Sequence, residues 1–176
     1  MPIMELSGLH KLPLDEKLLE TGLYVTQSSQ LKRKFYRYKR LQNFQTDIRI
    51  LRLLPSTEPD EVCCSLETYS INDNPFYVAV SYEWGDPEPE VDIRIDGRPF
   101  RIRHNLWLFL NYLQTKKLDM VTSDSFRLWA DAICIDQGNI AEKNAQVQIM
   151  SRIFKQADSV FAWLGYPTHL NPKTTI

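Results

Sequence analysis

The sequence predicts an α/β domain in which a strand, helix, strand core carries an added antiparallel hairpin and further N-terminal strands. Two apolar runs, residues 127–135 and 159–164, flank a segment with helical periodicity. Upstream, short runs with strand-like spacing are separated by turn-forming residues. A strand, a helix and a second strand in this order most often form a right-handed parallel crossover, which is the basis of the α/β assignment.

The core elements can be read one by one. Residues 127–135 are a nearly continuous apolar run, typical of a strand buried on both faces, and only Asp131 interrupts it. Residues 139–157 predict a helix, because Asn139 and Glu142 form an N-cap signal and apolar residues follow at helical spacing. The predicted apolar face consists of Ile140, Val147, Met150, Ile153, Phe154 and Ala157. Residues 159–164 complete the unit as a second strand.

The upstream segments predict the β additions. Residues 47–54, 62–69 and 76–82 have the spacing of strands. Residues 91–95 and 100–102 flank the pair Asp96 and Gly97, which is a hairpin signal, and Pro99 predicts that the second arm is an edge strand. Asn105 is the expected N-cap of a following helix whose apolar face is Leu106, Phe109, Leu110 and Leu113.

Length and composition predict one intracellular domain. A chain of 176 residues can bury a single core, and 43% hydrophobic residues exclude a wholly disordered protein. The net charge of −1 implies no polyanionic or membrane partner. No apolar stretch reaches the roughly 20 residues of a membrane span, and the N-terminus lacks a signal peptide, so a cytoplasmic location is expected. The three cysteines are expected to be reduced thiols, with no metal site.

Residues 1–45 differ from the rest and are predicted to be an N-terminal extension, with the domain proper over residues 46–176. The extension contains a basic run, residues 31–40, in which Phe35, Tyr36 and Tyr38 are interleaved with Lys and Arg. Such a run suits phosphates and stacked bases, but it is also typical of a solvated face beside a domain. We favour the solvated face, and expect no nucleic-acid partner, because the whole chain is not basic.

The candidate site lies where two strands are predicted to end. Ligands of open α/β sheets bind beyond the carboxyl ends of the parallel strands. The first loop there contains Ser81, Tyr82, Glu83, Trp84 and Gly85, and the second contains Asp136, Gln137, Gly138 and Asn139. We expect both loops at one rim of the sheet. A helix N-terminus could hold a phosphate and Trp84 or Tyr82 could stack on a base, but Asp136 would repel phosphate and no Gly-rich phosphate motif is present.

Several polar residues admit a functional and a structural interpretation. Asp131 could orient a ribose or a cation, or it could accept backbone amides within the sheet, which we slightly favour. Glu142 and Gln146 are expected to have capping or structural roles, and Trp163 and Gly165 to end the last strand. The three histidines are scattered without a nucleophile motif, so no catalytic residue is assigned.

Two sequence blocks resemble the fungal heterokaryon-incompatibility (HET) domain. YVAVSYEWGDP is similar to the first block of that family, and LWADAICIDQ, followed by EKNAQVQIM and AWLG, is similar to the second. The resemblance covers roughly residues 45–165, with its core over residues 77–165. Three residues depart from the family pattern. Ala130 replaces a branched apolar residue, while Asp136 and Glu83 add charge near the expected site.

The resemblance implies a signalling or effector module in fungal non-self recognition, a form of innate immunity that ends in programmed cell death. The partner would be another protein or a second copy of the domain. The outline is also similar to that of the Toll/interleukin-1 receptor (TIR) domain, so the alternative is an NAD glycohydrolase with NAD as substrate. In that family the catalytic glutamate follows the third strand, whereas no acidic residue follows Gly165 here. We therefore expect a C-terminally incomplete domain without NAD cleavage, unless Glu83, Asp131, Asp136 or Glu142 substitutes.

Overall fold

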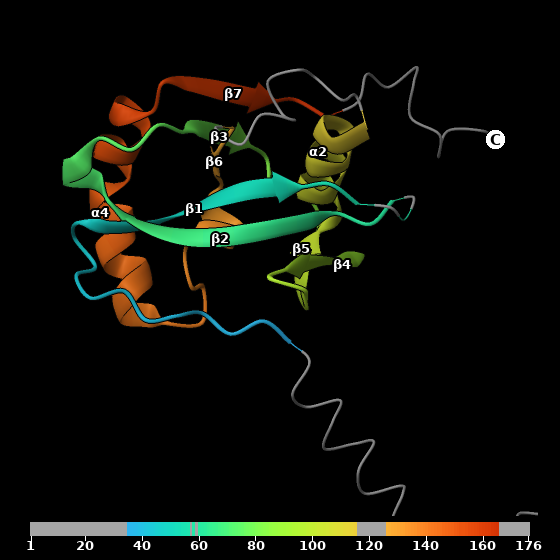
Figure 1. The fold of residues 1–176 in the computed structure, drawn as a ribbon, viewed down its shortest axis with the longest axis horizontal. Helices are drawn as coiled ribbons and strands as arrows, with labels where there is room; N and C mark the ends of the chain where they lie inside the picture. The colour runs from blue at the N-terminus through green and yellow to red at the C-terminus, as the bar shows by residue number, and fades with distance from the viewer. Residues whose placement is uncertain (1–34, 57, 59, 116–125, 166–176) are drawn as a thin grey trace, which may run out of the picture. The chain divides into compact units, whose positions relative to one another are not determined.

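The computed structural model of the protein describes residues 35–56, 58, 60–115 and 126–165. They form one mixed α/β unit of strands and helices around a seven-stranded sheet (Figure 1). The strands are β1 (Asp47–Leu54), β2 (Cys63–Ser70), β3 (Val78–Tyr82), β4 (Glu90–Ile95), β5 (Arg98–Arg103), β6 (Leu128–Trp129) and β7 (Ser159–Trp163). The helices are α2 (His104–Thr115), α3 (Asp131–Cys134) and α4 (Ile140–Gln156), with a 3-10 turn at Ile71–Asp73.

The sheet is mixed, with the strand order β5-β4-β2-β1-β6-β3-β7. Strands β1 and β2 pair antiparallel over their whole length, as do β4 and β5. Strands β6, β3 and β7 are parallel to one another. The predicted crossover is therefore confirmed as a parallel unit of β6, α4 and β7, and β3 lies between its two strands. Figure 1 shows β3 and β7 side by side, leading from α4 toward α2.

The hairpin and edge-strand predictions are confirmed. Asp96 and Gly97 both have positive φ, 50° and 74°, which is the backbone geometry of the tight turns that match the twist of antiparallel strands. Glycine adopts this conformation without steric cost. Strand β5, which contains Pro99, is the terminal strand of the sheet. The backbone amide of Tyr36 donates to the Pro99 carbonyl at 2.9 Å, so the segment before β1 lies along this edge.

The prediction of one strand over residues 127–135 is wrong. Only Leu128 and Trp129 are extended, and a short helix begins at Asp131. The Asp131 carboxylate accepts the amide of Ala132 at 2.8 Å, so a residue expected inside a strand instead starts a helical turn. An apolar run of this length cannot be assigned to strand or helix by periodicity alone, and most of its residues are buried in the observed structure.

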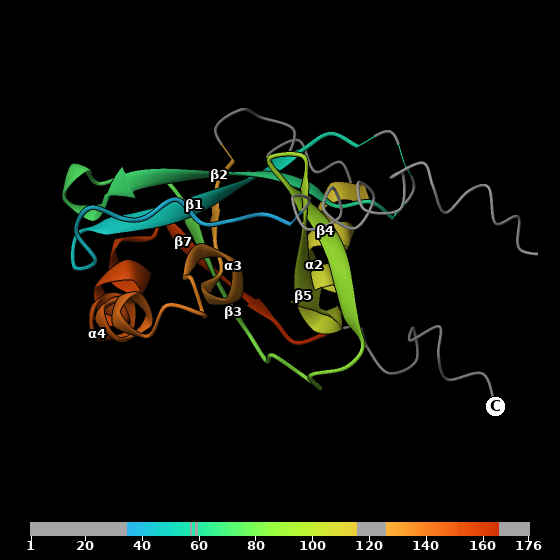
Figure 2. The ribbon, with the colours of Figure 1, turned by 90° about the horizontal axis from the view of Figure 1, so that it is seen from below.

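The face of α4 that is turned toward the sheet is partly polar. Met150, Ile153, Phe154 and Ala157 face the core as predicted. In contrast, Ile140 and Val147 were expected on the same face but are 75% and 52% exposed. Glu142 and Gln146, rather than these two residues, lie on the buried face of α4, and they are 1% and 0% exposed. Figure 2 shows α4 and α3 below β1 and β2.

Helix α2 packs its predicted apolar face into the core. Leu106, Phe109, Leu110 and Leu113 are all buried, and Phe109 contacts Phe161 and Trp163 of β7 through their rings. The prediction that Asn105 caps this helix is wrong, because the helix already begins at His104. Asn105 instead donates to the carbonyl of Glu83 and accepts the indole N–H of Trp163 at 3.0 Å. It thereby ties the ends of β3 and β7 to the start of α2.

Candidate functional site

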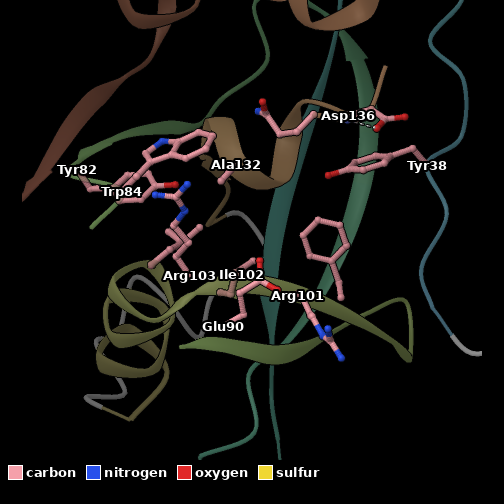
Figure 3. Close-up of a pocket in the computed structure, with 13 residues that line it drawn as sticks. Tyr38, Tyr82, Trp84, Glu90, Arg101, Ile102, Arg103, Ala132 and Asp136 are labelled. Carbon is pink, nitrogen blue, oxygen red and sulfur yellow. Dashed lines mark hydrogen bonds between the residues drawn. The ribbon is translucent and has the colours of Figure 1, made fainter. Parts of the chain in front are cut away.

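A pocket of about 330 Å³ opens between the loop after β3, the α3 to α4 connection and strand β5 (Figure 3). It brings together parts of the two loops that the sequence placed at one rim, because β3 and β6 are adjacent parallel strands. Tyr82 and Trp84 come from the first loop and Asp136, Gln137 and Gly138 from the second. The other lining residues are Tyr38, Ala132 and Leu106 together with Glu90, Phe100, Arg101, Ile102 and Arg103 of the hairpin.

Trp84 forms one wall of this pocket, and Asp131, which does not line the pocket, holds the Trp84 ring. The Trp84 indole N–H donates to Asp131 Oδ2 at 3.0 Å, and the second carboxylate oxygen holds the amide of Ala132. Burial raises the pKa of the Tyr82 hydroxyl, and the charge of Asp131 and a hydrogen bond to it act in the same direction. Asp131 thus fixes the Trp84 ring through a hydrogen bond. The expectation that its carboxylate accepts backbone amides within the sheet is not met, because the amide that it accepts belongs to the short helix α3.

Arg103 holds Trp84 from the other side. Its guanidinium carbon lies 5.0 Å from the centre of the Trp84 ring, within the range of a cation–π contact. Nη1 of Arg103 also donates to the carbonyl of Gly85 at 2.8 Å. Gly85 has a φ of 69°, a left-handed conformation that favours glycine, so the chain can turn here between Trp84 and the loop to β4. Arg103 is a site residue that the sequence analysis did not identify.

The second loop is held by a buried ion pair. Glu142 accepts from Arg49 of β1, with Nη2 to Oε2 at 3.0 Å, and it also accepts the amide of Asp136 at 2.8 Å. Arg49 further donates to the carbonyls of Cys134 and Lys39. Both side chains are almost fully buried, at 2% and 1% exposure. The carboxylate of Glu142 therefore fixes the Asp136 loop against the sheet.

The residues after Asp136 complete this loop. Gly138 donates its amide to Asp136 Oδ1 at 3.1 Å, and Gln137 donates to the carbonyl of Asp131 at 2.9 Å. The Asn139 side chain accepts the amide of Glu142 at 3.2 Å, which is the expected N-cap of α4. The reciprocal half of the predicted capping box does not form, because the Glu142 carboxylate is turned toward Arg49 and Asp136.

Gln146 was expected to have a capping or structural role, and its side chain is fully buried. Its amide nitrogen donates to the carbonyls of Phe44 and Asp47, at 2.7 and 2.9 Å. Glu142 and Gln146 lie one turn apart on the same face of α4, so the two polar side chains together attach the helix to β1 and the segment before it.

Tyr38 supplies the wall opposite Trp84, and it comes from the basic run that precedes β1. Its hydroxyl donates to the carbonyl of Ile133 at 2.8 Å, and the Arg49 guanidinium lies 4.7 Å from its ring centre. Tyr36, Tyr38 and Phe100 pack edge to face, with ring centres 5.4 to 6.0 Å apart. These two tyrosines are thus packed on the domain, while residues 1–34 of the predicted extension lie outside the described residues.

A second hollow, of about 610 Å³, is lined by the remaining residues of the first loop. Ser81, Glu83 and Gly85 line it together with Asn105, and Trp163 and Gly165 form its other side. Ser81 and Glu83 are exposed and do not line the first pocket. Gly165 has a φ of 85°, consistent with a turn directly after β7. The structure therefore divides the predicted site residues between two neighbouring hollows.

Comparison with known proteins identifies the family. The model of the heterokaryon incompatibility protein (HET) family matches residues 77–174, which include both loops, Asp131, Glu142 and Gln146. The chain belongs to the HET family. This HET chain is 35% identical over 134 residues to heterokaryon incompatibility protein 6, OR allele, of Neurospora crassa. The match covers 71% of the chain and 20% of the Neurospora protein, so the chain spans about a fifth of that relative's length.

No solved structure matches the HET chain. Among the described residues, no helix has the length and apolar character needed to cross a membrane. Two residues that shape the pocket, Tyr38 and Arg49, precede the segment that the family model matches. The site of this HET chain is therefore completed by residues upstream of the matched segment.

Proposed function

We propose that this HET chain is an effector module of heterokaryon incompatibility, which triggers cell death after two genetically different fungal cells fuse. The observation that carries the proposal is the family membership, together with the 35% identity to a Neurospora protein named for heterokaryon incompatibility. The segment that the family model matches includes residues that hold the pocket loops, among them Asp131 and Glu142.

The module acts through protein contacts. Besides Phe35 and Phe76, two pairs of large apolar side chains are exposed among the described residues. Ile140 and Val147 lie seven residues apart on the outer face of α4 and are 75% and 52% exposed. Val160 and Leu164, at and just after β7, are 47% and 95% exposed. Exposed apolar patches mark interaction sites, and these two pairs are the surfaces that we propose for contact with a protein partner or a second copy.

Two carboxylates near the pocket, of which Glu142 is buried and Asp131 half-buried, also support a contact-based role. Asp131 is engaged by Trp84 and by the amide of Ala132, and Glu142 is engaged by Arg49 and by the amide of Asp136. Each carboxylate thus orients a loop that shapes the pocket. A carboxylate that acts in catalysis needs to reach the substrate, whereas these two are directed at the protein's own donors.

The test is a chimera in Neurospora crassa. The segment of the relative that matches this chain is replaced by the corresponding residues of this chain, and the chimera is expressed in strains that fuse with an incompatible partner. We expect fusion cells to die at a rate comparable with the rate for the unaltered relative. Survival of the fusion cells, with the chimera present at normal levels, would contradict the proposal.

Surface variants of the same chimera test the contact mechanism. Val147→Ser on α4 and Leu164→Ser after β7 should each reduce cell death, because both side chains are exposed and contribute little to the folded core. Lys143→Ala is the matched control, since Lys143 is also exposed on α4 but is not apolar. If both serine variants kill as efficiently as the control, the module does not act through these surfaces.

A further inference from the structure

The segment before β1 and the edge strand β5 bring two basic stretches of the sequence side by side. The amide of Tyr36 donates to the carbonyl of Pro99 at 2.9 Å, which places the segment along this strand. Residues 35–40 and 98–103 together contain six of the 21 Lys and Arg residues of the chain and none of its 22 Asp and Glu residues. The net charge of −1 for the whole chain therefore does not describe this edge of the sheet.

Most of the basic side chains at this edge are exposed. Burial alternates along residues 35–39, because Tyr36 and Tyr38 pack against β5 while the residues between them are turned to solvent. We use the name basic edge for the exposed side chains of the two stretches, which are Phe35, Arg37, Lys39, Arg40, Arg98 and Arg101. Of its basic members, only Arg101 forms an ion pair with another described residue, to Asp92 at 3.3 Å. The other charges of the basic edge can therefore engage an external anion.

The neighbouring strand β4 reduces this positive charge but does not cancel it. Residues 90–96 contain three acidic residues and one arginine, Arg94, which pairs with Glu61 at 2.9 Å. The three stretches together thus have a net charge of +4. A surface of this charge complements an extended anionic surface.

One exposed aromatic ring lies within the basic edge. Phe35 is 48% exposed, and the guanidinium carbon of Arg101 lies 5.7 Å from the centre of its ring. Figure 3 shows the Arg101 side chain pointing away from the pocket residues Tyr38 and Trp84. An exposed ring among Lys and Arg side chains suits a membrane surface, because the cations attract anionic head groups and the ring enters the boundary between head groups and acyl chains.

We propose that the basic edge is a peripheral binding surface for membranes that contain anionic phospholipids. Its Arg and Lys side chains contact the lipid head groups, and Phe35 enters the head-group boundary. A nucleic acid is a poorer match, because bases stack on successive exposed rings, whereas Tyr36 and Tyr38 are packed against β5. The inference goes beyond the proposed function and does not depend on it.

Cosedimentation of the purified chain with lipid vesicles tests the proposal. The probes are vesicles of phosphatidylcholine alone and vesicles with about 30% phosphatidylserine. At low salt we expect binding to the phosphatidylserine vesicles to be at least about tenfold stronger, and we expect this preference to disappear at about 0.5 M salt, where the charges are screened. Equal binding to both kinds of vesicle at low salt, or binding to neither, would overturn the proposal.

A single-stranded oligonucleotide is the competing probe. It is about 16 nucleotides long, which is the upper end of the site size of a single-strand-binding module. We expect it to leave the chain on the phosphatidylserine vesicles at equal concentrations of anionic groups. Displacement of the chain from the vesicles by the oligonucleotide would replace the membrane by a nucleic acid as the partner and would refute the proposal.

Variants test whether the basic edge makes the contact. Arg37→Gln combined with Arg101→Gln should weaken binding to phosphatidylserine vesicles by about 25-fold, since each basic residue near the surface contributes about fivefold. Phe35→Ser should weaken it by at least about fivefold, because the apolar contact is lost. Lys143→Gln combined with Lys155→Gln is the matched control, since both lysines are exposed on α4. Thermal unfolding verifies that each variant is folded. Equal weakening in the control and the charge variant would contradict the proposed surface.

A last variant separates the basic edge from the basic residues that precede it in the sequence. Lys32, Arg33 and Lys34 lie outside the described residues. In the combined variant Lys32→Gln, Arg33→Gln and Lys34→Gln we expect the preference for phosphatidylserine vesicles to remain. If this variant loses the preference while Arg37→Gln with Arg101→Gln keeps it, the basic edge is not the membrane surface and the proposal is wrong.

Discussion

Arg49 of β1 and Glu142 of α4 form a buried ion pair that connects residues 93 positions apart. The pair joins the first strand of the sheet to the helix that follows the second pocket loop. Each member of the pair also binds the backbone of another segment. Arg49 donates to the carbonyls of Lys39 and Cys134, and Glu142 accepts the amide of Asp136. The segment before β1 and the Asp136 loop are thus fixed by one pair of side chains.

Removing one member of this pair should strongly destabilise the protein. We expect Glu142→Ala to lower the free energy of unfolding by about 3–5 kcal/mol, because the charge of Arg49 would remain buried without its partner. Urea unfolding followed by tryptophan fluorescence measures the change. Lys143→Ala, on the exposed side of the same helix, is the control and should have almost no effect.

The double variant Arg49→Met with Glu142→Leu separates the charge pairing from the packing. It should lose less stability than the sum of the two single variants, since no unpaired charge is left in the core. Strictly additive losses would mean that the two side chains stabilise the protein independently of each other.

The buried residues around α3 should be among the most sensitive apolar positions. Trp129 and Ile133 are both 0% exposed, and the Trp129 ring packs edge to face on Phe154. Trp129→Ala and Ile133→Ala should each lower the free energy of unfolding by about 2–5 kcal/mol, because each leaves a cavity in the core. Melting temperatures of the two variants and of Lys143→Ala provide the test. Equal shifts in all three would show that residues 128–134 are not in the core.

The Trp84 wall depends on Asp131. Asp131→Ala should lower the free energy of unfolding by about 1.5–3 kcal/mol, the contribution typical of a hydrogen bond to a charged group, and should leave the Trp84 indole without this acceptor. Asp131→Asn keeps an acceptor oxygen and should cost less. The comparison is made by urea unfolding. An equal loss for the two variants would mean that the charge of Asp131, which both variants remove, rather than its hydrogen bonds, maintains the wall.

The buried hydroxyl of Tyr77 predicts a loss of stability in alkaline solution. Burial and the nearby charge of Asp158 raise the pKa of Tyr77 to about 12, from an ordinary value near 10. Between these two values the unfolded chain releases the proton and the folded chain retains it. The contribution of Tyr77 is therefore fully present below about pH 10 and is lost as the pH rises to about 12.

Tyr77→Phe tests this pH dependence. The variant loses the hydrogen bond from the Tyr77 hydroxyl to the Ile153 carbonyl, which lowers stability at every pH below 10 by about 1 kcal/mol. Between about pH 10 and pH 12 its unfolding free energy should decrease less steeply than that of the unaltered protein. Identical slopes for the two proteins would show that Tyr77 does not titrate differently on folding.

The spacing of apolar residues and the residues typical of turns and helix caps predicted much of the fold. The alternation in residues 47–54 predicted β1, the pair Asp96 and Gly97 predicted the β4 to β5 turn, and Asn139 predicted the start of α4. These features depend on neighbours within a few residues, so the sequence contains the information needed to predict them. The order of the two loops along parallel strands also sufficed to predict that Trp84 and Asp136 line one pocket.

Tertiary structure decided how polar residues are distributed between core and surface. Glu142 and Gln146 are buried and Ile140 is exposed because Arg49, nearly a hundred residues earlier, requires a carboxylate on the inner face of α4. A charged residue in the apolar strand of Arg49 was the one signal available, but it could not identify the partner. Pocket walls such as Tyr38 and Arg103 likewise come from distant segments. Burying a charge is favourable only when a partner from elsewhere in the fold neutralises it, and local periodicity contains no information about that partner.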